Sequence, residues 1–329
     1  MAHLDRMLRS NIKLRHLQLL VALDQFRHLG RTSEFLSVSQ PAVSRMLTEI
    51  EAMLGQTLFV RSTRGTAPTA AGIVMVRFAR SVLAQYDRTR DEIGAQESGA
   101  AGRVRIGAMS VALSPLLADA VDILKAESAR ATVLIETGDL TGLLPKLRLG
   151  ETDLFVGRLE PGYAAPDLTT EALYADPMVA VIAPGHALAR KRKLRWDDIA
   201  ELPCVLPPPW ASLRVKLEQQ FHRHGVQPPG DVIESSSYQA TVLFVQRRGA
   251  VAFLAAGTAR DLERAGALRV LPLSVDVDLP SVGIIALRET VPTAVTARMM
   301  DALRSAARAM QRRHATAHRR HAEGSCDAK

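Results

Sequence analysis

Four polar side chains close together in the sequence are of the types that bind double-stranded DNA: Gln40, Ser44, Arg45 and Thr48. Spacings of four residues place three of them on one helix face, with Arg45 beside them. Amides, hydroxyls and guanidinium groups hydrogen-bond to base edges and to phosphate oxygens. The first N–H groups of a helix also attract phosphate. These residues predict a helix that enters the DNA major groove, although an ordinary amphipathic surface helix is the alternative.

The surrounding residues predict where that helix begins and which side it buries. Ser39 is a favourable N-cap residue, and Pro41 lies in the first turn, where its missing N–H costs nothing. Gly55 is placed to end the helix. Apolar residues recur at spacings of four, three and four on the opposite side, at Val43, Leu47, Ile50 and Leu54. That side is therefore expected to face a core.

The flanking segments complete a helix-turn-helix unit with a wing. A helix that begins at Leu14 and a short helix at 32–36 precede a tight turn at 37–39. After the DNA-facing helix, a strand at 58–61 leads into a basic, Gly-containing turn at 64–69. A hairpin of this kind lies along the DNA backbone, where Arg61 and Arg64 are the natural phosphate partners.

Residues 12–98 resemble the DNA-binding end of the LysR-type transcriptional regulators. The matching motifs are, in order, Gln40-Pro41-Ala42-Val43-Ser44-Arg45, Ile50-Glu51, Leu54-Gly55, Leu58-Phe59, Arg61 and Thr69-Ala70-Ala71-Gly72. The resemblance implies DNA contacts by Gln40, Pro41, Ala42, Ser44, Arg45, Thr48, Arg61 and Arg64. The family usually has two alanines early in its second helix, where this chain has Thr32 and Ser33. Their hydroxyls either change local packing or bond a carbonyl one turn back, and we interpret them as tolerated variation.

Length, charge and cysteine content agree with such a regulator. The chain has 329 residues, enough for two or three domains, and 47% of them are apolar. A formal charge of +8 favours a polyanionic partner, although a basic tail raises it. Cys204 and Cys326 are the only cysteines, which excludes a disulfide-stapled scaffold and is typical of the cytoplasm. The N-terminal residues lack the apolar core of a signal peptide, and no apolar run approaches the roughly 20 residues that cross a bilayer.

A long helix is expected at 69–98, after a DNA-binding domain that we assign to residues 1–68. Its small and apolar positions are spaced close to a heptad, at Gly72, Val76, Ala79, Leu83, Tyr86 and Ile93. Periodicity alone also allows a helix that packs on its own domain. The family resemblance implies a dimerisation linker that holds two DNA-binding domains over an interrupted palindrome. Small residues and glycines then predict a hinge at 99–102.

Residues 103–310 alternate between strands and helices. Apolar runs separated by helical segments predict a parallel, helix-covered sheet. The resemblance continues at Gly150-Glu151-Thr152-Asp153-Leu154 and at 249–254, and it implies an effector domain of two α/β lobes joined by two crossovers, like a periplasmic solute-binding protein. We assign lobe one to 103–162 and 268–310, lobe two to 163–267, and 311–329 to a basic disordered tail. The predicted fold class is α+β multidomain: a winged helix-turn-helix, a long linker helix and a two-lobed α/β effector domain.

Candidate effector-binding residues follow predicted strands or open helices, because ligands of open α/β sheets bind there. They are Ser110, Val111, Arg158, Trp210, Ser212 and Arg214. Hydroxyls, N–H donors, two guanidinium groups and an indole suit a small carboxylate. By resemblance, Ser110 and Ser212 fall where relatives hold an effector. Plain helix capping is the alternative for each serine, and solvated surface charge is the alternative for the two arginines.

Other functional classes find less support. The phosphate-loop, dinucleotide-binding and His-Glu-x-x-His motifs of enzymes are missing from the sequence, and we predict no cofactor. His314 and His318 allow a metal site, but they lie in a polar run without apolar anchors. Cys204 is interpreted as a buried structural thiol rather than a redox sensor. A solute-binding module with a vestigial DNA-binding head is the remaining alternative. The resemblance implies RNA polymerase and further copies of the chain, as a homodimer or homotetramer, as partners, and no membrane.

Overall fold

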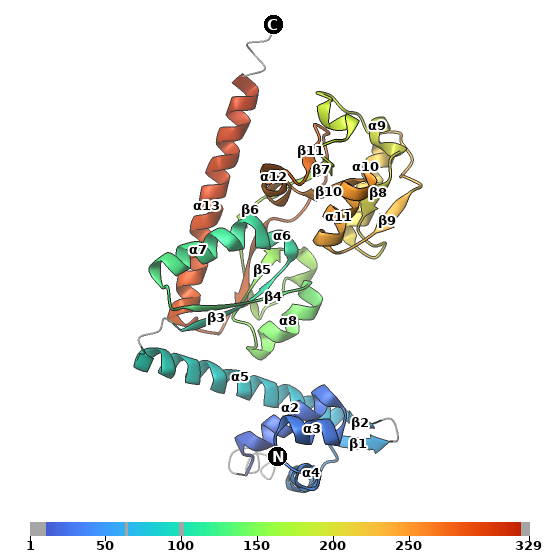
Figure 1. Ribbon diagram of the computed structural model, residues 1–329. Helices are drawn as coiled ribbons and strands as arrows, with labels where there is room; N and C mark the ends of the chain where they lie inside the picture. Colours follow the sequence, from blue (N-terminus) through green and yellow to red (C-terminus); the bar gives the residue numbers. More distant parts are fainter. Residues whose placement is uncertain (1–10, 63–64, 99–101, 324–329) are drawn as a thin grey trace. The chain divides into compact units, whose positions relative to one another are not determined.

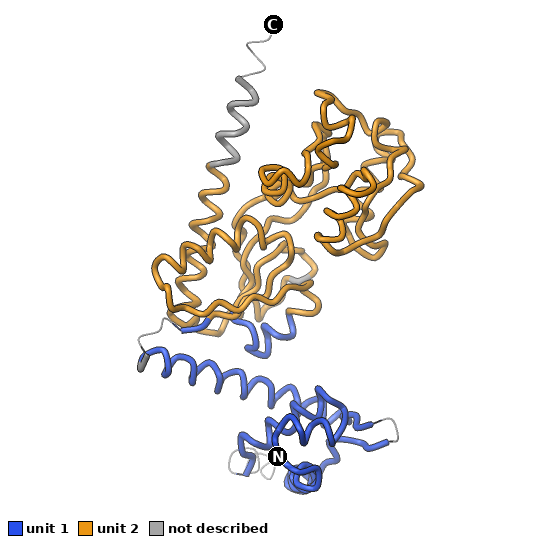
Figure 2. Tube along the Cα trace, viewed as in Figure 1, with its two compact units in different colours: residues 1–103, 144–153 blue, residues 104–143, 154–329 orange. Residues whose placement is uncertain are grey.

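The computed structural model describes residues 11–62, 65–98 and 102–323 (Figure 1). The chain divides into two compact units, which are residues 1–103 with 144–153 and residues 104–143 with 154–329 (Figure 2). Of the predicted hinge at 99–102, only Gly102 belongs to the described residues. Each unit is built around its own buried apolar residues, and each carries one group of the predicted functional residues.

The N-terminal unit contains the predicted helix-turn-helix and wing. Its elements are α2 (Leu14–Phe26), α3 (Leu29–Phe35), α4 (Gln40–Leu54), β1 (Phe59–Ser62) and β2 (Gly65–Pro68). The hydroxyl of Ser39 accepts a hydrogen bond from the N–H of Ala42, and Gly55 ends α4 with φ of 64°. The predicted inward residues Val43, Leu47, Ile50 and Leu54 are all buried. The predicted bounds of α4 are thus confirmed.

The wing is fastened to the end of α2. The N–H of Thr66 donates to the carbonyl of Arg27 over 2.8 Å. Gly65 has φ of 122°, and a Cβ there would lie 2.7 Å from the same carbonyl oxygen. Only glycine combines this backbone conformation with so close an approach. The wing therefore has a defined attachment to the helices that carry the recognition surface.

The long helix α5 (Ala70–Ser98) begins as predicted, because the hydroxyl of Thr69 accepts a bond from the N–H of Gly72 over 3.1 Å. Its first turns pack on the DNA-binding domain itself, with Val76 and Ala79 buried and Leu83 half-buried in that core. This part of the predicted stripe thus follows the alternative interpretation of a helix packed on its own domain. The large apolar residues of α5 that are exposed are Ile73, Val74 and Phe78, together with two positions of the predicted stripe, Tyr86 and Ile93.

The first lobe of the second half is a five-stranded sheet in the order β4-β3-β5-β12-β6. Its strands are β3 (Arg103–Ala108), β4 (Thr132–Thr137), β5 (Leu154–Arg158), β6 (Leu168–Tyr174) and β12 (Val282–Leu287). In the sequence, β3 is followed by α6 (Ser110–Ala112), a π-helical turn (Leu113–Leu117) and α7 (Ala118–Glu127), β4 is followed by α8 (Leu140–Leu149), and β12 is followed by α13 (Ala294–Glu323). Strands β3 and β5 are parallel, as predicted, but β12 runs antiparallel to both of its neighbours. The sheet is mixed because β12 returns from the other lobe.

The second lobe is also a five-stranded sheet, in the order β11-β7-β10-β8-β9. Its strands are β7 (Met178–Ile182), β8 (Cys204–Leu206), β9 (Val232–Glu234), β10 (Val251–Ala255) and β11 (Arg269–Val270). Its helices are α9 (Asp197–Ala200), α10 (Ser212–Arg223), α11 (Tyr238–Arg248) and α12 (Ala256–Arg264). The thiol of Cys204 is 1% exposed, and burial raises its pKa to about 12, as expected for a structural thiol.

The lobe boundaries differ from those that we predicted. Strand β6 was expected in lobe two, within 163–267, but it pairs with β12 in the first sheet from Leu168 to Tyr174. Strand β11 was expected in lobe one, within 268–310, but it pairs with β7 in the second sheet. The crossovers are therefore the short segment after Tyr174 and the longer segment 271–281. Both boundaries are set by strand pairing within the sheets, and the periodicity of the sequence does not reveal that pairing.

Side chains hold alternate carbonyls of the longer crossover. Its residues 271–281 lie outside helices and strands. The acceptors are the carbonyls of Ser274, Asp276, Asp278 and Pro280, and their donors, in the same order, are Trp196, Gln220, Lys216 and Arg158. The first three donors belong to lobe two, and Arg158 ends β5 of lobe one. Lobe two therefore holds this crossover as far as Asp278, and lobe one holds it at Pro280.

The closing helix α13 continues to Glu323, past Gln311, where we expected it to end in a disordered tail. The residues between 312 and 323 include no proline or glycine and are rich in alanine and arginine, which favour helix. Residues 324–329 lie outside the described part of the chain. Among the described residues, no helix is both long enough and apolar enough to span a membrane.

Candidate DNA-binding and effector-binding sites

The DNA-facing candidates lie together on α4. Gln40, Pro41, Arg45 and Thr48 are exposed, and Ala42 and Ser44 are half-buried. Capping by Ser39 leaves this helix start facing outward, with the core on the opposite side. The structure therefore brings these six residues to one accessible helix face. Such a face has the dimensions and the donor groups that major-groove recognition requires.

One candidate on the wing is bonded directly to α4. The Nη2 of Arg61 donates to the hydroxyl of Ser44 over 2.9 Å, from a side chain that is exposed. The hydroxyl of Thr48 donates to the carbonyl of Ser44 over 3.0 Å. Strand β1 and the recognition helix thus present their polar groups as one connected surface. Arg64, the other predicted phosphate partner, lies outside the described residues.

A half-buried carboxylate also joins the wing to α4. The Oε1 of Glu51, on the half-buried side of α4, accepts the N–H groups of Leu58 and Phe59 over 2.8 and 3.1 Å. Two backbone donors at the start of the wing are thereby satisfied by the recognition helix. Sequence reasoning had noted Glu51 as a family motif without assigning it a partner.

The departure from the family pattern in α3 has the predicted structural consequence. The hydroxyl of Thr32 donates to the carbonyl of His28 over 2.9 Å, and that of Ser33 donates to the carbonyl of Gly30 over 2.7 Å. Both residues are buried. Each hydroxyl bonds about one turn back, which satisfies it inside the domain.

In lobe one, Ser110 and Val111 open α6 directly after β3. The N–H of Met109 donates to the carbonyl of Val156 over 2.9 Å, so α6 begins beside the end of β5, where Arg158 lies. The N-cap of α6 is Met109, and Ser110 is the first residue of the helix. The exposed Ser110 hydroxyl is therefore not the cap, and the plain capping interpretation is wrong for it.

Arg158 is buried and joins the two crossovers. Its Nη1 donates to the carbonyl of Pro280 and its Nη2 to the carbonyl of Asp176, each over 2.9 Å. The side chain is 7% exposed, which excludes the interpretation as a solvated surface charge. Burial lowers the pKa of Arg158, whereas the nearby carboxylate of Asp176 raises it. The guanidinium group thus adds positive charge at the junction of the lobes.

The junction also holds residues that the sequence reasoning missed. Tyr174 ends β6, Asp176 lies on the first crossover, and Tyr238 opens α11. Tyr174 and Asp176 are buried, at 4% and 2% exposure. Their electrostatic interactions with Arg158 and with one another mark them as neighbours. The available local signal was an acidic residue, Asp176, directly before Pro177 and the apolar run of β7.

The remaining candidates belong to lobe two. Trp210 is 85% exposed, and Ser212 is the first residue of α10, after the N-cap Ala211. As with Ser110, the hydroxyl of Ser212 is not the helix cap. Arg214 pairs with the carboxylates of Glu218 and Glu234 over 2.6 and 3.1 Å. Its charge is therefore largely compensated within the lobe, unlike that of Arg158.

The two lobes touch directly beside the junction. The hydroxyl of Thr258, on α12, donates to the carbonyl of Ser114 over 3.1 Å. The hydroxyl of Ser114 also bonds the carboxylate of Asp261 on the same helix. The π-helical turn after α6 is thereby bonded to lobe two at two points.

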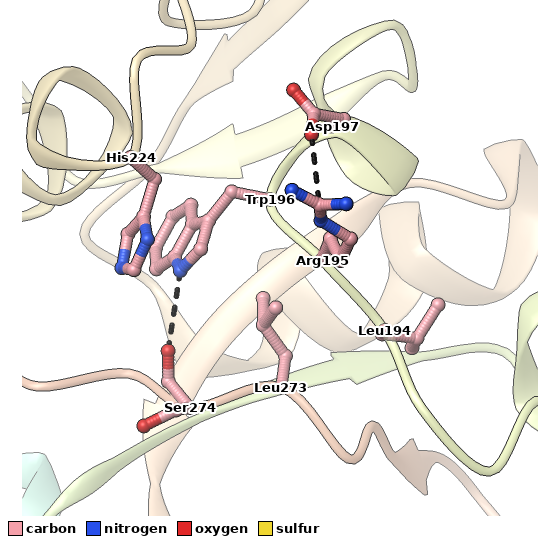
Figure 3. Close-up of a pocket in the computed structure, with 7 residues that line it drawn as sticks. All are labelled: Leu194, Arg195, Trp196, Asp197, His224, Leu273 and Ser274. Atoms are coloured by element: carbon pink, nitrogen blue, oxygen red, sulfur yellow. Dashed lines mark hydrogen bonds and ion pairs between the residues drawn. The ribbon is translucent and has the colours of Figure 1, made fainter.

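A separate pocket of about 200 Å³ lies in lobe two, lined by Leu194, Arg195, Trp196, Asp197, His224, Leu273 and Ser274 (Figure 3). The rings of Trp196 and His224 stack at 5.4 Å, and the indole N–H donates to the carbonyl of Ser274. None of the predicted effector residues lines it. Within the described residues, no three His, Cys, Asp or Glu side chains gather as metal ligands do, and the side chains of His314 and His318 lie outside that description.

Comparison with known proteins covers both halves of the chain. Residues 14–73 match the family model of bacterial regulatory helix-turn-helix proteins of the lysR family, and residues 97–308 match that of the LysR substrate binding domain. The HTH-type transcriptional regulator GbpR of Azospirillum brasilense is 31% identical over 93% of this chain and 90% of its own. PcaQ of Agrobacterium fabrum is 29% identical over 92% of this chain and 97% of its own.

Solved structures show the same fold. The crystal structure of CbnR, a LysR family transcriptional regulator, has a TM-score of 0.68 and 19% identity, and it covers 90% of this chain and 99% of its own. Full-length CbnR complexed with its target DNA has a TM-score of 0.67 and 19% identity, over 90% and 100% of the two chains. The predicted winged helix-turn-helix, linker helix and two-lobed effector domain are thereby confirmed as an architecture.

Proposed function

This chain belongs to the LysR family of DNA-binding transcriptional regulators, and we propose that it is a homo-oligomeric regulator which selects an interrupted palindrome and answers to a small carboxylate effector. The single observation that carries sequence selection is the exposed polar face of α4, joined to the wing by the bond from Arg61 to Ser44. Base-reading groups on a rigid helix and phosphate-binding groups on an attached wing are the two components of specific DNA binding.

The roles of individual residues follow from their positions. Gln40, Ser44 and Arg45 read base edges, and Arg61, Arg64 and Thr48 hold phosphates, while Pro41 and Ala42 allow close approach of the helix start. The regulator works where the chromosome is, in the cytoplasm. DNA binding of this kind depends steeply on salt, because each phosphate contact releases counterions.

Two copies are proposed to pair through the exposed apolar face of α5. Val74 and Phe78 lie one turn apart on this face, and Tyr86 and Ile93 continue it toward the end of the helix. A monomer gains nothing by exposing these side chains, whereas a partner helix would bury them. Leu83, which the heptad spacing suggested, is committed to the core of its own DNA-binding domain.

The effector is proposed to bind at the junction of the lobes, with Ser110, Val111 and Arg158 as its contacts from lobe one and Trp210, Ser212 and Arg214 from lobe two. The buried guanidinium group of Arg158 favours a carboxylate. A ligand that prefers one arrangement of the lobes shifts the population toward it by no more than its differential affinity. The shift changes the orientation of the paired DNA-binding domains on DNA, and this alters the contact between the regulator and RNA polymerase.

The test is selection of genomic fragments by the purified full-length chain at physiological salt, with Arg45→Ala in parallel. The expected result is an interrupted palindrome for the parent chain, and a loss of about 1–3 kcal/mol with relaxed base preference at one position in each half-site for the variant. Arg77→Ala, an exposed arginine on α5, is the matched control.

Two outcomes would contradict the proposal. Diffuse enrichment without a motif would mean that α4 does not specify sequence. Binding that is weak and insensitive to salt would favour the alternative of a solute-binding module with a vestigial head. An equal loss for Arg45→Ala on every sequence would assign that residue to phosphate instead of a base.

A further inference from the structure

A cluster of four polar side chains lies where the two lobes join. Arg158 comes from the end of β5, Tyr174 from the end of β6, Asp176 from the first crossover and Tyr238 from the start of α11. Each of the four has electrostatic interactions with others of the group. The cluster is therefore one electrostatic unit, assembled from both lobes and the segment between them.

Two atoms of this cluster are buried without a hydrogen-bond partner. They are the Oδ2 of Asp176 and the hydroxyl of Tyr174. Their residues are only 2% and 4% exposed. Tyr238 differs, since its hydroxyl forms hydrogen bonds with the backbone of Ala255 and with Thr258. A buried polar atom without a partner lowers stability, so natural proteins keep very few of them without a functional reason.

The structural duties of Asp176 use its other atoms. Its Oδ1 accepts the N–H of Gly257 at the start of α12 over 3.0 Å, and its carbonyl accepts the guanidinium of Arg158. The bond to the start of α12 thus accounts for one carboxylate oxygen, whereas Oδ2 remains without a hydrogen-bond partner. A Cβ at position 257 would lie 3.4 Å from Oδ2 and 3.1 Å from the Cδ of Pro115, so Gly257 lets the start of α12 approach both this carboxylate and the π-helical turn.

The unpaired atoms lie beside the proposed effector contacts. Arg158 is bonded to Asp176 and ends β5, and the start of α6 is attached to the preceding residues of β5 through the bond from Met109 to Val156. Positive charge for a carboxylate comes from Arg158, and a second arginine, Arg260, also acts electrostatically on Asp176. A carboxylate alone, however, offers no hydrogen-bond donor to Oδ2 of Asp176.

We propose that the effector is an acid that also carries a hydroxyl or amino group, and that this group donates to Oδ2 of Asp176 while the hydroxyl of Tyr174 donates to an oxygen of the ligand. This inference rests on the proposed function and narrows its effector class. It predicts strong rejection of the analogue that lacks the donor, because such an analogue leaves a buried carboxylate oxygen unpaired.

The test uses matched pairs of probes on the full-length chain, measured by isothermal titration calorimetry: lactate with propanoate, malate with succinate, and 4-hydroxybenzoate with benzoate. In at least one pair the hydroxylated member is expected to bind about tenfold or more tightly than its partner. Asp176→Asn replaces the acceptor Oδ2 by an amide donor, so this preference is expected to fall or reverse. Tyr174→Phe is expected to weaken both members of the pair.

Asp278→Asn is the control variant, because it makes the same chemical change on an exposed side chain of the other crossover and is expected to leave the preference intact. Three results would overturn the inference: binding within about twofold for both members of every pair, no saturable binding of any hydroxylated probe in the millimolar range, or a preference that survives in Asp176→Asn. Raised thermal stability of Tyr174→Phe with unchanged binding would also overturn it, by showing that the hydroxyl serves no ligand.

Operator binding by the same preparations separates this inference from the proposed function. If selection of the palindrome persists while the probes fail, only the effector class proposed here is wrong. If both selection and probe binding fail in a folded protein, the proposed function fails with it.

Discussion

The DNA-binding domain and the lobe junction place their functional groups in opposite ways. On α4, six candidates lie within nine consecutive residues, and most of them are exposed on a helix whose other side is buried. At the junction, Arg158, Asp176 and Tyr238 come from separate elements and are largely withdrawn from solvent. The first site is a property of one helix, whereas the second exists only when two sheets and two crossovers are in place.

On α4, a substitution is expected to change DNA binding without changing stability. At the lobe junction, a substitution is expected to change both ligand binding and stability. A side chain such as Arg45 is exposed and holds no part of its domain together, so its loss affects DNA binding alone. Arg158 binds two main-chain carbonyls at the point where the lobes meet, so its loss affects folding and ligand binding together. Substitutions at the two sites therefore test the comparison directly.

The largest expected effect is at the junction. Arg158→Met keeps the bulk of the side chain but leaves the carbonyls of Pro280 and Asp176 without their donor, which is expected to cost about 3 kcal/mol of stability. The measurement is urea unfolding of the full-length chain, followed by Trp196 and Trp210, the two tryptophans of the chain, which both report on lobe two. Binding of DNA by the folded fraction is expected to persist.

Arg195→Met is the matched control, because this side chain is 86% exposed and is expected to change stability by less than about 0.5 kcal/mol. A cost below about 1 kcal/mol for Arg158→Met would show that the two carbonyl bonds do not hold the crossovers together. A matching loss of DNA affinity at equal folded fraction would show that the two halves are not separable.

The proposed dimerisation face of α5 should give the next largest effect. Phe78→Glu places a charge on the exposed apolar face and is expected to weaken a dimer by about 2 kcal/mol, or roughly 30-fold in its dissociation constant. Leu83→Glu instead places the charge against the core of the DNA-binding domain and should lower the thermal stability of that domain. Analytical ultracentrifugation and thermal unfolding distinguish the two. A dimer that survives Phe78→Glu would show that another surface joins the copies.

A smaller effect is expected where the wing meets α4. Glu51→Ala removes the acceptor of the N–H groups of Leu58 and Phe59 and should cost the DNA-binding domain about 1.5 kcal/mol. Glu51→Gln retains an amide oxygen at this position and should recover most of the loss. Unfolding curves of the full chain, followed by hydrogen exchange at residues 58 and 59, provide the measurement. Equal losses in the two variants would mean that the charge, and not the acceptor, holds the wing.

The features of α4 could be predicted from the sequence, whereas those of the lobes could be predicted only in part. The caps and the buried side of α4 were predictable, because Ser39, Gly55 and the apolar spacing act within a few residues of one another. The first turns of α5 were ambiguous, since one stripe serves either a partner helix or the domain itself, and only the packing of Val76 and Ala79 decides. The lobe boundaries were wrong because pairing of β6 with β12 joins segments more than 100 residues apart.

At the proposed effector site, even less could be predicted from the sequence, because its residues act through partners that are distant in the sequence. Arg158 was predictable as a residue after a buried strand, but its two carbonyl bonds were not, because Pro280 lies 122 residues away. Asp176 and Tyr174 were missed for the same reason, since an acidic residue before a proline is a weak local signal and does not reveal their partners. Residues that act through distant partners need the tertiary structure, whereas residues on one capped helix do not.

The smallest expected effect concerns a long-range ion pair in the effector half. Both oxygens of Glu171, on β6, accept bonds from Arg304 on α13, over 2.8 and 2.7 Å. These bonds lower the pKa of Glu171, although partial burial raises it. A carboxyl group whose pKa is lowered by folding adds stability above its unfolded pKa, and the contribution is lost as the pH falls through the folded value.

Stability relative to Glu171→Gln should therefore be highest at neutral pH and should decline in the acid range, below the ordinary pKa of a glutamate. Both side chains are more than a third exposed, so solvent screening limits the difference to less than about 1 kcal/mol. Unfolding by urea at a series of pH values measures it, with Glu289→Gln, the same chemical change on an exposed glutamate, as the control. Parallel curves for the parent and Glu171→Gln would show that this contact, although it joins β6 to α13 across 133 residues, adds no pH-dependent stability.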